Sequence, residues 1–243
     1  METKVTGVNE ARALVATPEF QKELAGRSFR HFLDYVNILE RPQPLRGIEG
    51  GVQPFQKWDH LMELAEMFET KRLITVLKAR QVGFSWIVSA YALWMVVFRD
   101  GTAVMELSRG QLESRDLLDK AKFIYKHLPA EWNLPEVAMD NASGFRLKGM
   151  ESEMVALPST EDAGRGKTSS LVIQDEADFH QYAEANLVAV KPTIDGGGQL
   201  IMASTVNKRS LRSPFKNFYG SSPSNGWAKL FVPWSVRPER TQE

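Results

Sequence analysis

The strongest hydrophobic pattern in the chain lies between residues 73 and 97. A short apolar run rich in β-branched side chains stops at a basic loop, and a long apolar segment begins just after Gly83 and Ser85. A short β-branched run predicts a buried strand, whereas an apolar segment of helical length predicts a helix. We therefore expect a strand, a tight loop and a helix, in that order.

Further apolar patterns alternate between helix and strand along the rest of the chain. Helix patterns cover residues 20–39, with a break near Gly26, 58–70 and 114–128; strand patterns cover residues 102–107, 171–178, 199–207 and 230–234; and a hairpin pattern covers residues 145–157. This arrangement predicts an α/β protein with a mostly parallel sheet flanked by helices.

The loop between the strand and the helix of residues 73–97 has the features of an anion site. Free backbone N–H groups and the helix dipole both face a loop in this position. Nucleotide phosphate loops read G-x-x-x-x-G-K-[ST] here, and Gly83 and Ser85 occupy their standard slots. Phe84 stands in the lysine slot, and Lys78 stands in the slot of the first glycine. The long stem of Lys78 can reach the same phosphates, so we expect a phosphate loop with a relocated lysine; a solvated strand end is the alternative.

A second stretch, residues 161–168, matches the end of the same pattern. Lys167 and Thr168 stand in the standard slots, but they lead through two serines into another strand-like run. No helix N-terminus then faces this loop, so a phosphate there would lack the amide groups that hold it. We interpret the stretch as a connector between two strands.

Two adjacent acidic residues, Asp175 and Glu176, lie near the end of the strand pattern of residues 171–178. Ligands of open α/β sheets bind at the C-terminal edge of the strands, where these carboxylates are expected. Asp175 can hold a Mg²⁺ ion that Ser85 also touches, and Glu176 can polarise the attacking water. The alternative is that both acids begin a helix. The phosphate loop upstream in the same topology favours the first interpretation.

Polar residues elsewhere are candidates for further nucleotide contacts. Gln56 precedes the helix that leads into the phosphate loop, and its amide offers a donor and an acceptor side by side for an adenine edge. A surface turn is the alternative for Gln56, and the neighbouring Phe55 either stacks on the base or fills the core. Ser204 and Thr205 end the strand pattern of residues 199–207, where they either sense the γ-phosphate or cap the strand.

Composition limits the chemistry of the protein. The 243 residues contain no cysteine, which excludes disulfides and thiolate chemistry, and none of the four histidines pairs with another at ligand spacing. No apolar run approaches the roughly 20 residues of a membrane helix, and the N-terminus lacks an apolar signal segment. We therefore expect a cytoplasmic protein without a zinc site.

Charge is balanced over the whole chain, with 30 acidic and 30 basic side chains. A nucleic-acid surface must then be a local patch. The candidate patch is formed by Lys208, Arg209, Arg212 and Lys216. A solvated helix face explains these four residues equally well.

Taken in order, the motifs resemble the ATPase domain of tailed-bacteriophage large terminase subunits. The resemblance covers residues 50–236 and is carried by Gln56, Lys78-Ala79-Arg80-Gln81-Val82-Gly83-Phe84-Ser85, Val172-Ile173-Gln174-Asp175-Glu176-Ala177 and Ala203-Ser204-Thr205. It implies a P-loop NTPase fold of the ASCE, RecA-like kind, with a helical appendage at residues 1–50, an ATPase domain at residues 51–236 and a linker or chain end at residues 237–243. Because no acidic cluster follows Trp234, the nuclease domain of large terminases is expected to be missing.

The resemblance also implies roles for individual residues. The nucleotide would contact Gln56, Lys78, Ala79, Arg80, Gln81, Val82, Gly83, Phe84, Ser85 and Trp86; Mg²⁺ would contact Ser85 and Asp175; Glu176 would be the catalytic carboxylate; and Ser204 and Thr205 would form the coupling motif. An arginine finger would come from Arg165 of a neighbouring subunit, or from Arg80 of the same chain.

The implied function is a viral DNA-packaging motor that uses ATP and Mg²⁺ to drive double-stranded DNA into procapsids. Its implied partners are the DNA, the portal protein, the small terminase subunit and further copies of the chain in a ring. Its implied location is the cytoplasm of the infected bacterial host, transiently on the procapsid. One alternative is a helicase-like DNA-dependent ATPase. The other is a nucleotide- or DNA-binding adaptor with weak catalysis, and Phe84 in the lysine slot is the feature that favours it.

Overall fold

The computed structural model describes residues 17–42, 44, 49–164, 168–237 and 240. In chain order the elements are α2 (Pro18–Arg27), α3 (Phe29–Phe32), β1 (Asn37–Glu40), β2 (Gly51–Pro54), α4 (Asp59–Thr70), β3 (Leu73–Lys78), α5 (Phe84–Phe98), β4 (Ala103–Ser108), α6 (Gln111–Lys126), η2 (Ala130–Trp132), β5 (Val137–Asn141), β6 (Gly144–Leu147), β7 (Glu153–Pro158), β8 (Leu171–Gln174), η3 (Ala177–Phe179), α7 (Ala183–Asp195), β9 (Gln199–Ser204), α8 (Pro214–Ser221), β10 (Ala228–Val232) and η4 (Trp234–Val236). Within these ranges no helix has the length and apolar character needed to cross a bilayer.

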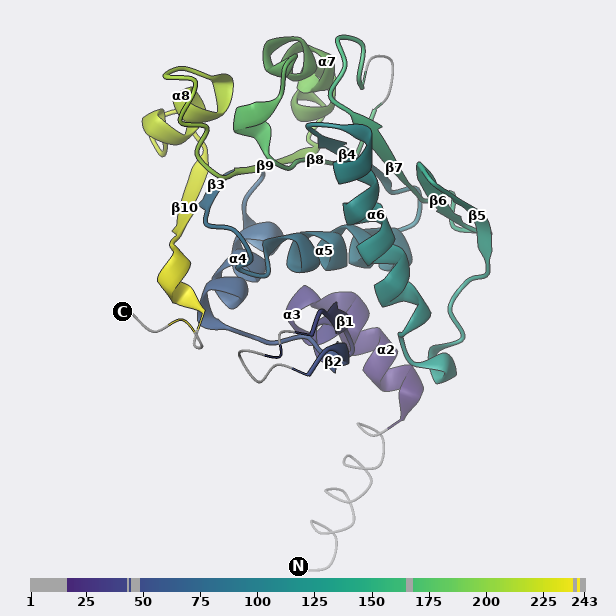
Figure 1. Ribbon diagram of the computed structural model, residues 1–243. Coiled ribbons are helices and arrows are strands. Elements are labelled where there is room, and N and C mark those ends of the chain that lie inside the picture. The colour runs from purple at the N-terminus through teal and green to yellow at the C-terminus, as the bar shows by residue number, and fades with distance from the viewer. Residues whose placement is uncertain (1–16, 43, 45–48, 165–167, 238–239, 241–243) are drawn as a thin grey trace, which may run out of the picture.

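An eight-stranded sheet forms the centre of the molecule, with the strand order β10-β3-β9-β8-β4-β7-β6-β5 (Figure 1). Every neighbouring pair from β10 to β7 is parallel. β6 and β5 continue the sheet in antiparallel pairs. The carboxyl ends of the parallel strands therefore meet at one edge of the sheet, and the predicted mostly parallel α/β fold is confirmed.

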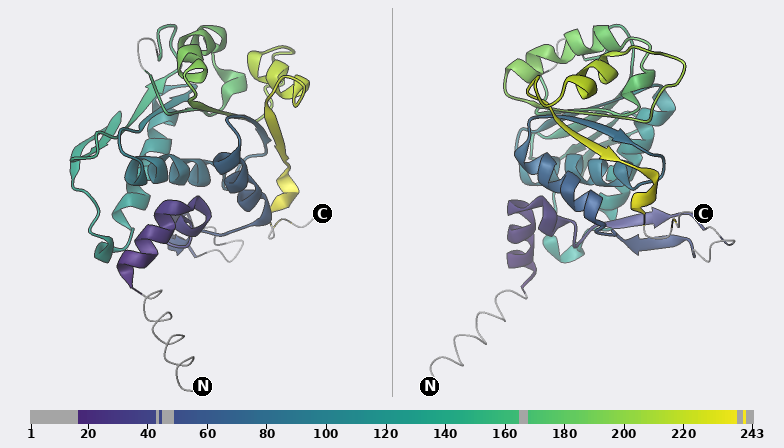
Figure 2. Two further views of the ribbon diagram at one scale, coloured as in Figure 1. Left: turned by 180° about the vertical axis from the view of Figure 1, so that it is seen from behind. Right: turned by 90° about the vertical axis from the view of Figure 1, so that its left-hand side faces the viewer.

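Helices cover both faces of the sheet, as the side view in Figure 2 shows. α4, α5 and α6 pack on one face with α2 and α3 beyond them, and α7 and α8 pack on the other (Figure 1). Within β8 the residues alternate between the two faces, since Leu171 and Ile173 join the first core cluster and Val172 joins the second. Burial on both sides explains why these strands have continuous apolar sequences.

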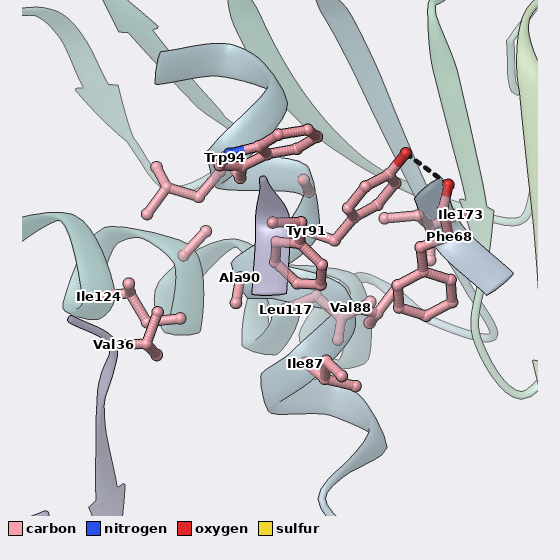
Figure 3. Close-up of a cluster of buried hydrophobic side chains, with 14 of the residues drawn as sticks. Val36, Phe68, Ile87, Val88, Ala90, Tyr91, Trp94, Leu117, Ile124 and Ile173 are labelled. Atoms are coloured by element: carbon pink, nitrogen blue, oxygen red, sulfur yellow. Dashed lines mark hydrogen bonds between the residues drawn. The ribbon is translucent and has the colours of Figure 1, made fainter. Parts of the chain in front are cut away.

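α5 is the central helix of the larger core cluster (Figure 3). Its residues are apolar on all sides and most of them are buried, as expected for a helix enclosed by other elements. The hydroxyl of Tyr91 donates a hydrogen bond to Phe68 O of α4 at 2.8 Å (Figure 3). The indole of Trp94 donates to Ala25 O of α2 at 2.8 Å. These two bonds fix α5, and with it the loop before it, against two neighbouring helices.

The N-terminal region differs from the prediction of one helix over residues 20–39. The expected break near Gly26 is present, because α2 ends at Arg27 and Ser28 caps α3. The end of the segment is wrong: residues 37–40 form β1, which pairs antiparallel with β2 from Asn37↔Pro54 to Glu40↔Gly51. Backbone pairing with a distant strand overrides the local helical spacing there. The division of the chain at residue 50 stays a prediction.

The other predicted elements are present with shifts of a few residues at their ends. The helix patterns became α4 and α6, and the strand patterns became β4, β8, β9 and β10. The predicted hairpin is β6 and β7, paired from Gly144↔Val155 to Arg146↔Glu153. The sequence patterns did not predict α7 or β5.

Candidate nucleotide site

The loop between β3 and α5 follows the predicted order of strand, tight loop and helix. Gly83 is the residue before the helix and has φ +82°, and Gln81 has φ +58°. Residues other than glycine rarely adopt this left-handed conformation. Two left-handed residues in so short a loop let the chain reverse and enter α5 with its first N–H groups at the carboxyl edge of the sheet.

The carbonyl groups of this loop are held by other parts of the chain. Val82 O lies 2.8 Å from Nε2 of His60, a buried residue of α4. Gln81 O accepts hydrogen bonds from Arg237 at 3.1 Å and from Arg240 at 3.0 Å. Within the part of the chain that the structure describes, the backbone N–H groups of residues 80–86 donate no hydrogen bond. The loop therefore presents amide donors to a ligand, as an anion site requires.

Lys78 joins the loop to the acidic pair at the end of β8. Its Nζ lies 3.2 Å from Asp175 Oδ1 and 3.1 Å from Glu176 Oε1, and the three side chains are 7%, 12% and 28% exposed. The Nζ also lies 5.4 Å from the centre of the Phe84 ring. Phe84 itself is buried in the core. The only ammonium that the structure places between this loop and the acids, among the described residues, is thus that of Lys78.

The buried charges of this group change its pKa values. Burial by itself lowers the pKa of Lys78, but the charges of Asp175 and Glu176 outweigh it, and the pKa of Lys78 is raised above 10.5. Burial by itself raises the pKa of Glu176, but Lys78 and the hydrogen bonds from Thr205 outweigh it, and the pKa of Glu176 falls below 4.5. Lys78 and Glu176 are therefore both charged at neutral pH.

Glu176 also contacts the end of β9. Its Oε2 accepts hydrogen bonds from Thr205 N at 3.1 Å and Thr205 Oγ1 at 2.9 Å, and Ser204 Oγ lies at 3.4 Å. Ser204 Oγ further accepts a hydrogen bond from Asp178 N at 3.1 Å. The structure therefore brings Ser204 and Thr205 to the predicted catalytic carboxylate, and their role as a coupling motif stays a prediction.

The residues predicted to hold Mg²⁺ lie at the carboxyl edge of the sheet. Asp175 follows β8, and Ser85 lies half-buried in the first turn of α5. Among the described residues no group of three or more acidic, histidine or cysteine side chains forms a metal cage. Mg²⁺ commonly uses one or two protein oxygens together with substrate phosphates and water. The carboxylate of Asp175 and the hydroxyl of Ser85, both at the carboxyl edge of the sheet, are oxygen ligands of the kind that ion takes.

The free energy of unfolding is expected to depend on pH because of the charges around Lys78. The lowered pKa of Glu176 adds stability that is present above pH 4.5 and is lost as the pH falls through the lower pKa of the folded state. The raised pKa of Lys78 adds stability that is present below pH 10.5 and is lost as the pH rises through its higher folded value.

On acidification below about pH 4, we expect the free energy of unfolding to fall more in the wild type than in Glu176→Gln. Urea denaturation of both proteins measures this, and parallel curves would contradict it.

A cavity of about 470 Å³ lies beside the loop. Its lining includes Gln56, Trp58, Gln81, Trp86 and Arg237. The Gln56 side chain is exposed and donates to Pro54 O at 3.1 Å, in the irregular segment between β2 and α4 at the rim of the cavity. Gln56 therefore lies on the surface beside the cavity, and its contact with an adenine stays a prediction. Phe55, also at the cavity, is buried in the core cluster.

The competing stretch of residues 161–168 is placed in part. Arg165 and Lys167, the predicted arginine finger and the competing lysine, lie outside the described residues. β7 ends at Pro158 and β8 begins at Leu171, and the described residues between them, 159–164 and 168–170, form no helix, which agrees with a connector between two strands. Arg80, the alternative finger, is exposed in the β3–α5 loop.

The predicted basic patch is smaller than its four residues suggest. Lys208, Arg209 and Arg212 are exposed. Lys216 is half-buried, and its Nζ donates to Asn207 O at 2.7 Å and lies 3.3 Å from Asp178 Oδ2. Lys216 therefore holds the loop before α8, and the exposed part of the patch consists of the other three side chains.

The structure also shows residues of the site that the sequence did not indicate. His60, Arg237 and Arg240 hold the loop carbonyls, and only folding brings them there. Glu106 in β4 is fully buried, and burial raises its pKa to about 8. Within the described ranges neither of its carboxylate oxygens accepts a hydrogen bond. A charged residue inside an apolar strand pattern was the available signal for Glu106.

Solved structures of phage large terminases share this fold, although no protein-family model matches the chain. The large terminase ATPase domain of Thermus phage P74-26 is 17% identical, with a TM-score of 0.58 over 76% of this chain and 85% of that chain. The HK97 bacteriophage large terminase is 12% identical, with a TM-score of 0.63 over 89% and 45%. A large terminase from another thermophilic bacteriophage, solved in complex with ATP-γ-S, is 12% identical, with a TM-score of 0.55 over 76% and 47%.

These comparisons confirm the resemblance to large terminase ATPase domains at the level of the fold. The matched region spans a little under half of the HK97 chain and of the chain solved with ATP-γ-S, and most of the P74-26 domain. The sheet and the helices on its two faces are thus arranged as in these large terminase structures.

Proposed function

We propose that the protein is the ATPase motor domain of a viral large terminase, which hydrolyses ATP with Mg²⁺ to drive double-stranded DNA into a procapsid. The observation that carries this proposal is the position of Lys78. From the start of the loop its ammonium reaches both Asp175 and Glu176, at 3.2 and 3.1 Å. A phosphate loop and an acidic pair that share one cation can act on one triphosphate.

The strand order supports a P-loop NTPase of the ASCE, RecA-like kind. This class has an additional strand between the phosphate-loop strand and the acidic strand, together with a catalytic glutamate. Here β9 lies between β3 and β8, and Glu176 follows β8. The end of β9 therefore lies between the loop and the acids, where Ser204 and Thr205 contact Glu176.

Phosphate binding in this proposal uses the loop amides and Lys78. The N–H groups of residues 80–86 surround the β-phosphate side of the nucleotide, and the helix dipole of α5 favours its negative charge. Lys78 turns from the acids toward the phosphates when the nucleotide binds. Since Phe84 is buried, the relocated Lys78 supplies the charge that the standard lysine slot lacks.

The hydrolytic step transfers the γ-phosphoryl group from ATP to water. Glu176 orients the attacking water and accepts its proton, and its contacts with Thr205 fix the direction of the carboxylate. Asp175 and Ser85 would hold Mg²⁺, which when bound neutralises charge on the phosphates. The products are ADP and phosphate.

Arginine fingers contribute about 10³- to 10⁵-fold to the rate of such enzymes. We assign this role to Arg165 of a neighbouring subunit, with Arg80 as the alternative in the same chain. A finger from a neighbour makes turnover depend on assembly, so a ring bound to the portal would be the active form and the monomer would be slow. The exposed Lys208, Arg209 and Arg212 provide the candidate contact with DNA phosphates.

Gln56 gives the proposal a test of base recognition. We expect Gln56→Ala to weaken ATP binding by about tenfold, because a paired donor and acceptor to the adenine edge is lost. Binding of GTP should change little. Titration calorimetry with both nucleotides measures the difference, and equal losses for ATP and GTP would show that Gln56 does not read the base.

Phosphate release from ATP, measured with Mg²⁺ and with or without double-stranded DNA, tests the function. We expect slow hydrolysis by the isolated chain and faster hydrolysis when DNA and the portal and terminase partners are added. Strand unwinding without a requirement for the portal would support a helicase-like ATPase instead. Tight ATP binding without turnover under every condition would support the adaptor.

A further inference from the structure

Two arginines after β10 contact the loop that precedes α5. Arg240 donates from both terminal nitrogens of its guanidinium, to Arg80 O at 3.2 and 3.3 Å and to Gln81 O at 3.0 Å. Arg237 donates to the same Gln81 oxygen at 3.1 Å. The sequence interpretation placed both arginines in a linker or chain end, and no step of the proposed function uses them.

Both guanidinium groups are also packed against aromatic rings. Arg240 is 8% exposed, and its guanidinium carbon lies 5.4 Å from the centre of the Trp234 ring in η4. The guanidinium carbon of Arg237 lies 4.7 Å from the ring of Trp58, which precedes α4. Stacking on a ring and a fixed fork of donors hold an arginine in one orientation better than a lysine could be held. These contacts are therefore built into the fold.

The contacts fix the direction of two peptide groups in the loop. In a trans peptide the carbonyl and the following N–H point in opposite directions. A guanidinium that holds Arg80 O and Gln81 O from one side therefore turns the N–H groups of Gln81 and Val82 to the other side. Gln81 has φ +58°, a conformation that its own side chain does not favour, so an external contact is needed to maintain it.

We propose that Arg240 is a positioning residue of the nucleotide site, which orients the loop amides toward the phosphates. Arg237 in this proposal forms part of the wall of the cavity beside the loop, where the base would lie. Arg237 lines that cavity together with Trp58 and Gln81. The inference rests on the proposed function, because it requires a nucleotide at this loop. It makes Arg237 and Arg240, which follow β10, part of the ATP site.

Binding of Mg²⁺ and ATP-γ-S to the whole chain tests this inference by titration calorimetry. We expect Arg240→Ala to raise the dissociation constant about tenfold, as for the loss of hydrogen bonds from a charged group. Arg240→Lys should recover part of the affinity, and Arg237→Ala should weaken binding as well. Arg27→Ala, at an exposed position on α2, is the matched control and should bind as the wild type does.

Kinetics and melting curves separate positioning from a general loss of structure. In Arg240→Ala we expect the KM for ATP to rise more than kcat falls, while thermal melting without nucleotide stays cooperative. Wild-type affinity in Arg240→Ala would overturn the inference while the proposed function stands. If Arg240→Ala does not fold, the affinities of Arg240→Lys and Arg237→Ala test the inference instead. Wild-type affinity in both of these variants would overturn the inference. A wild-type chain that binds no ATP would overturn the proposed function as well.

Discussion

Replacing Glu176 by glutamine is expected to lower kcat for ATP hydrolysis by about 10²- to 10⁴-fold, the usual contribution of a general base. Glutamine keeps the shape of the side chain and can still accept the hydrogen bonds from Thr205. It cannot take a proton from the attacking water. ATP binding should therefore persist, because Lys78 and the loop amides remain. Phosphate release and calorimetric titration of the same preparation measure the two effects separately.

The control for this variant is Glu23→Gln on α2, an exposed carboxylate paired only with Arg27 in the described structure. It removes one negative charge far from the loop and should leave the rate unchanged. Equal hydrolysis by wild type and Glu176→Gln would end the assignment of Glu176 as the catalytic carboxylate.

Replacing Lys78 by methionine is expected to have two large effects. Without nucleotide, Asp175 and Glu176 lose the cation between them, and removal of one partner from a buried ion pair costs about 3 kcal/mol of the free energy of unfolding. With nucleotide, the phosphates lose their only lysine in the described site, and ATP affinity should fall by about 10- to 100-fold. Urea denaturation and calorimetry measure the two effects.

The matched control is Lys167→Met, which removes the lysine of the competing stretch. We expect it to leave ATP affinity close to that of the wild type. The double variant Lys78→Met with Glu176→Gln should recover part of the lost stability, because one of the two unpaired charges is gone. Loss of ATP binding in Lys167→Met but not in Lys78→Met would move the site to the other loop.

The sequence predicted best those elements that are most buried. α5 and the inner parallel strands β3, β4, β8 and β9 are largely buried, so their apolar runs are continuous and easily recognised. β5 is exposed along most of its length, and its sequence shows no alternation between apolar and polar residues. β1 depends on pairing with β2, so its local helical spacing was misleading.

Some residues of the candidate site could likewise be predicted from the sequence, and others could not. Lys78, Asp175 and Glu176 stand at strand ends, and parallel strands bring such ends to one edge, so their proximity followed from topology. The residues that hold the loop carbonyls come from α4 and from the segment after β10. No sequence motif identifies these residues, because any hydrogen-bond donor in the right place could hold the loop carbonyl groups. Their identification required the folded chain.

A crystal structure of the chain with Mg²⁺ and ATP-γ-S would show whether a triphosphate binds between β3 and α5. We expect phosphates against the N–H groups of residues 80–86, with the Lys78 ammonium turned toward them and Glu176 facing the γ-phosphate. Phosphates bound instead at the stretch of residues 161–168, or at a distance from Asp175 and Glu176, would contradict this expectation.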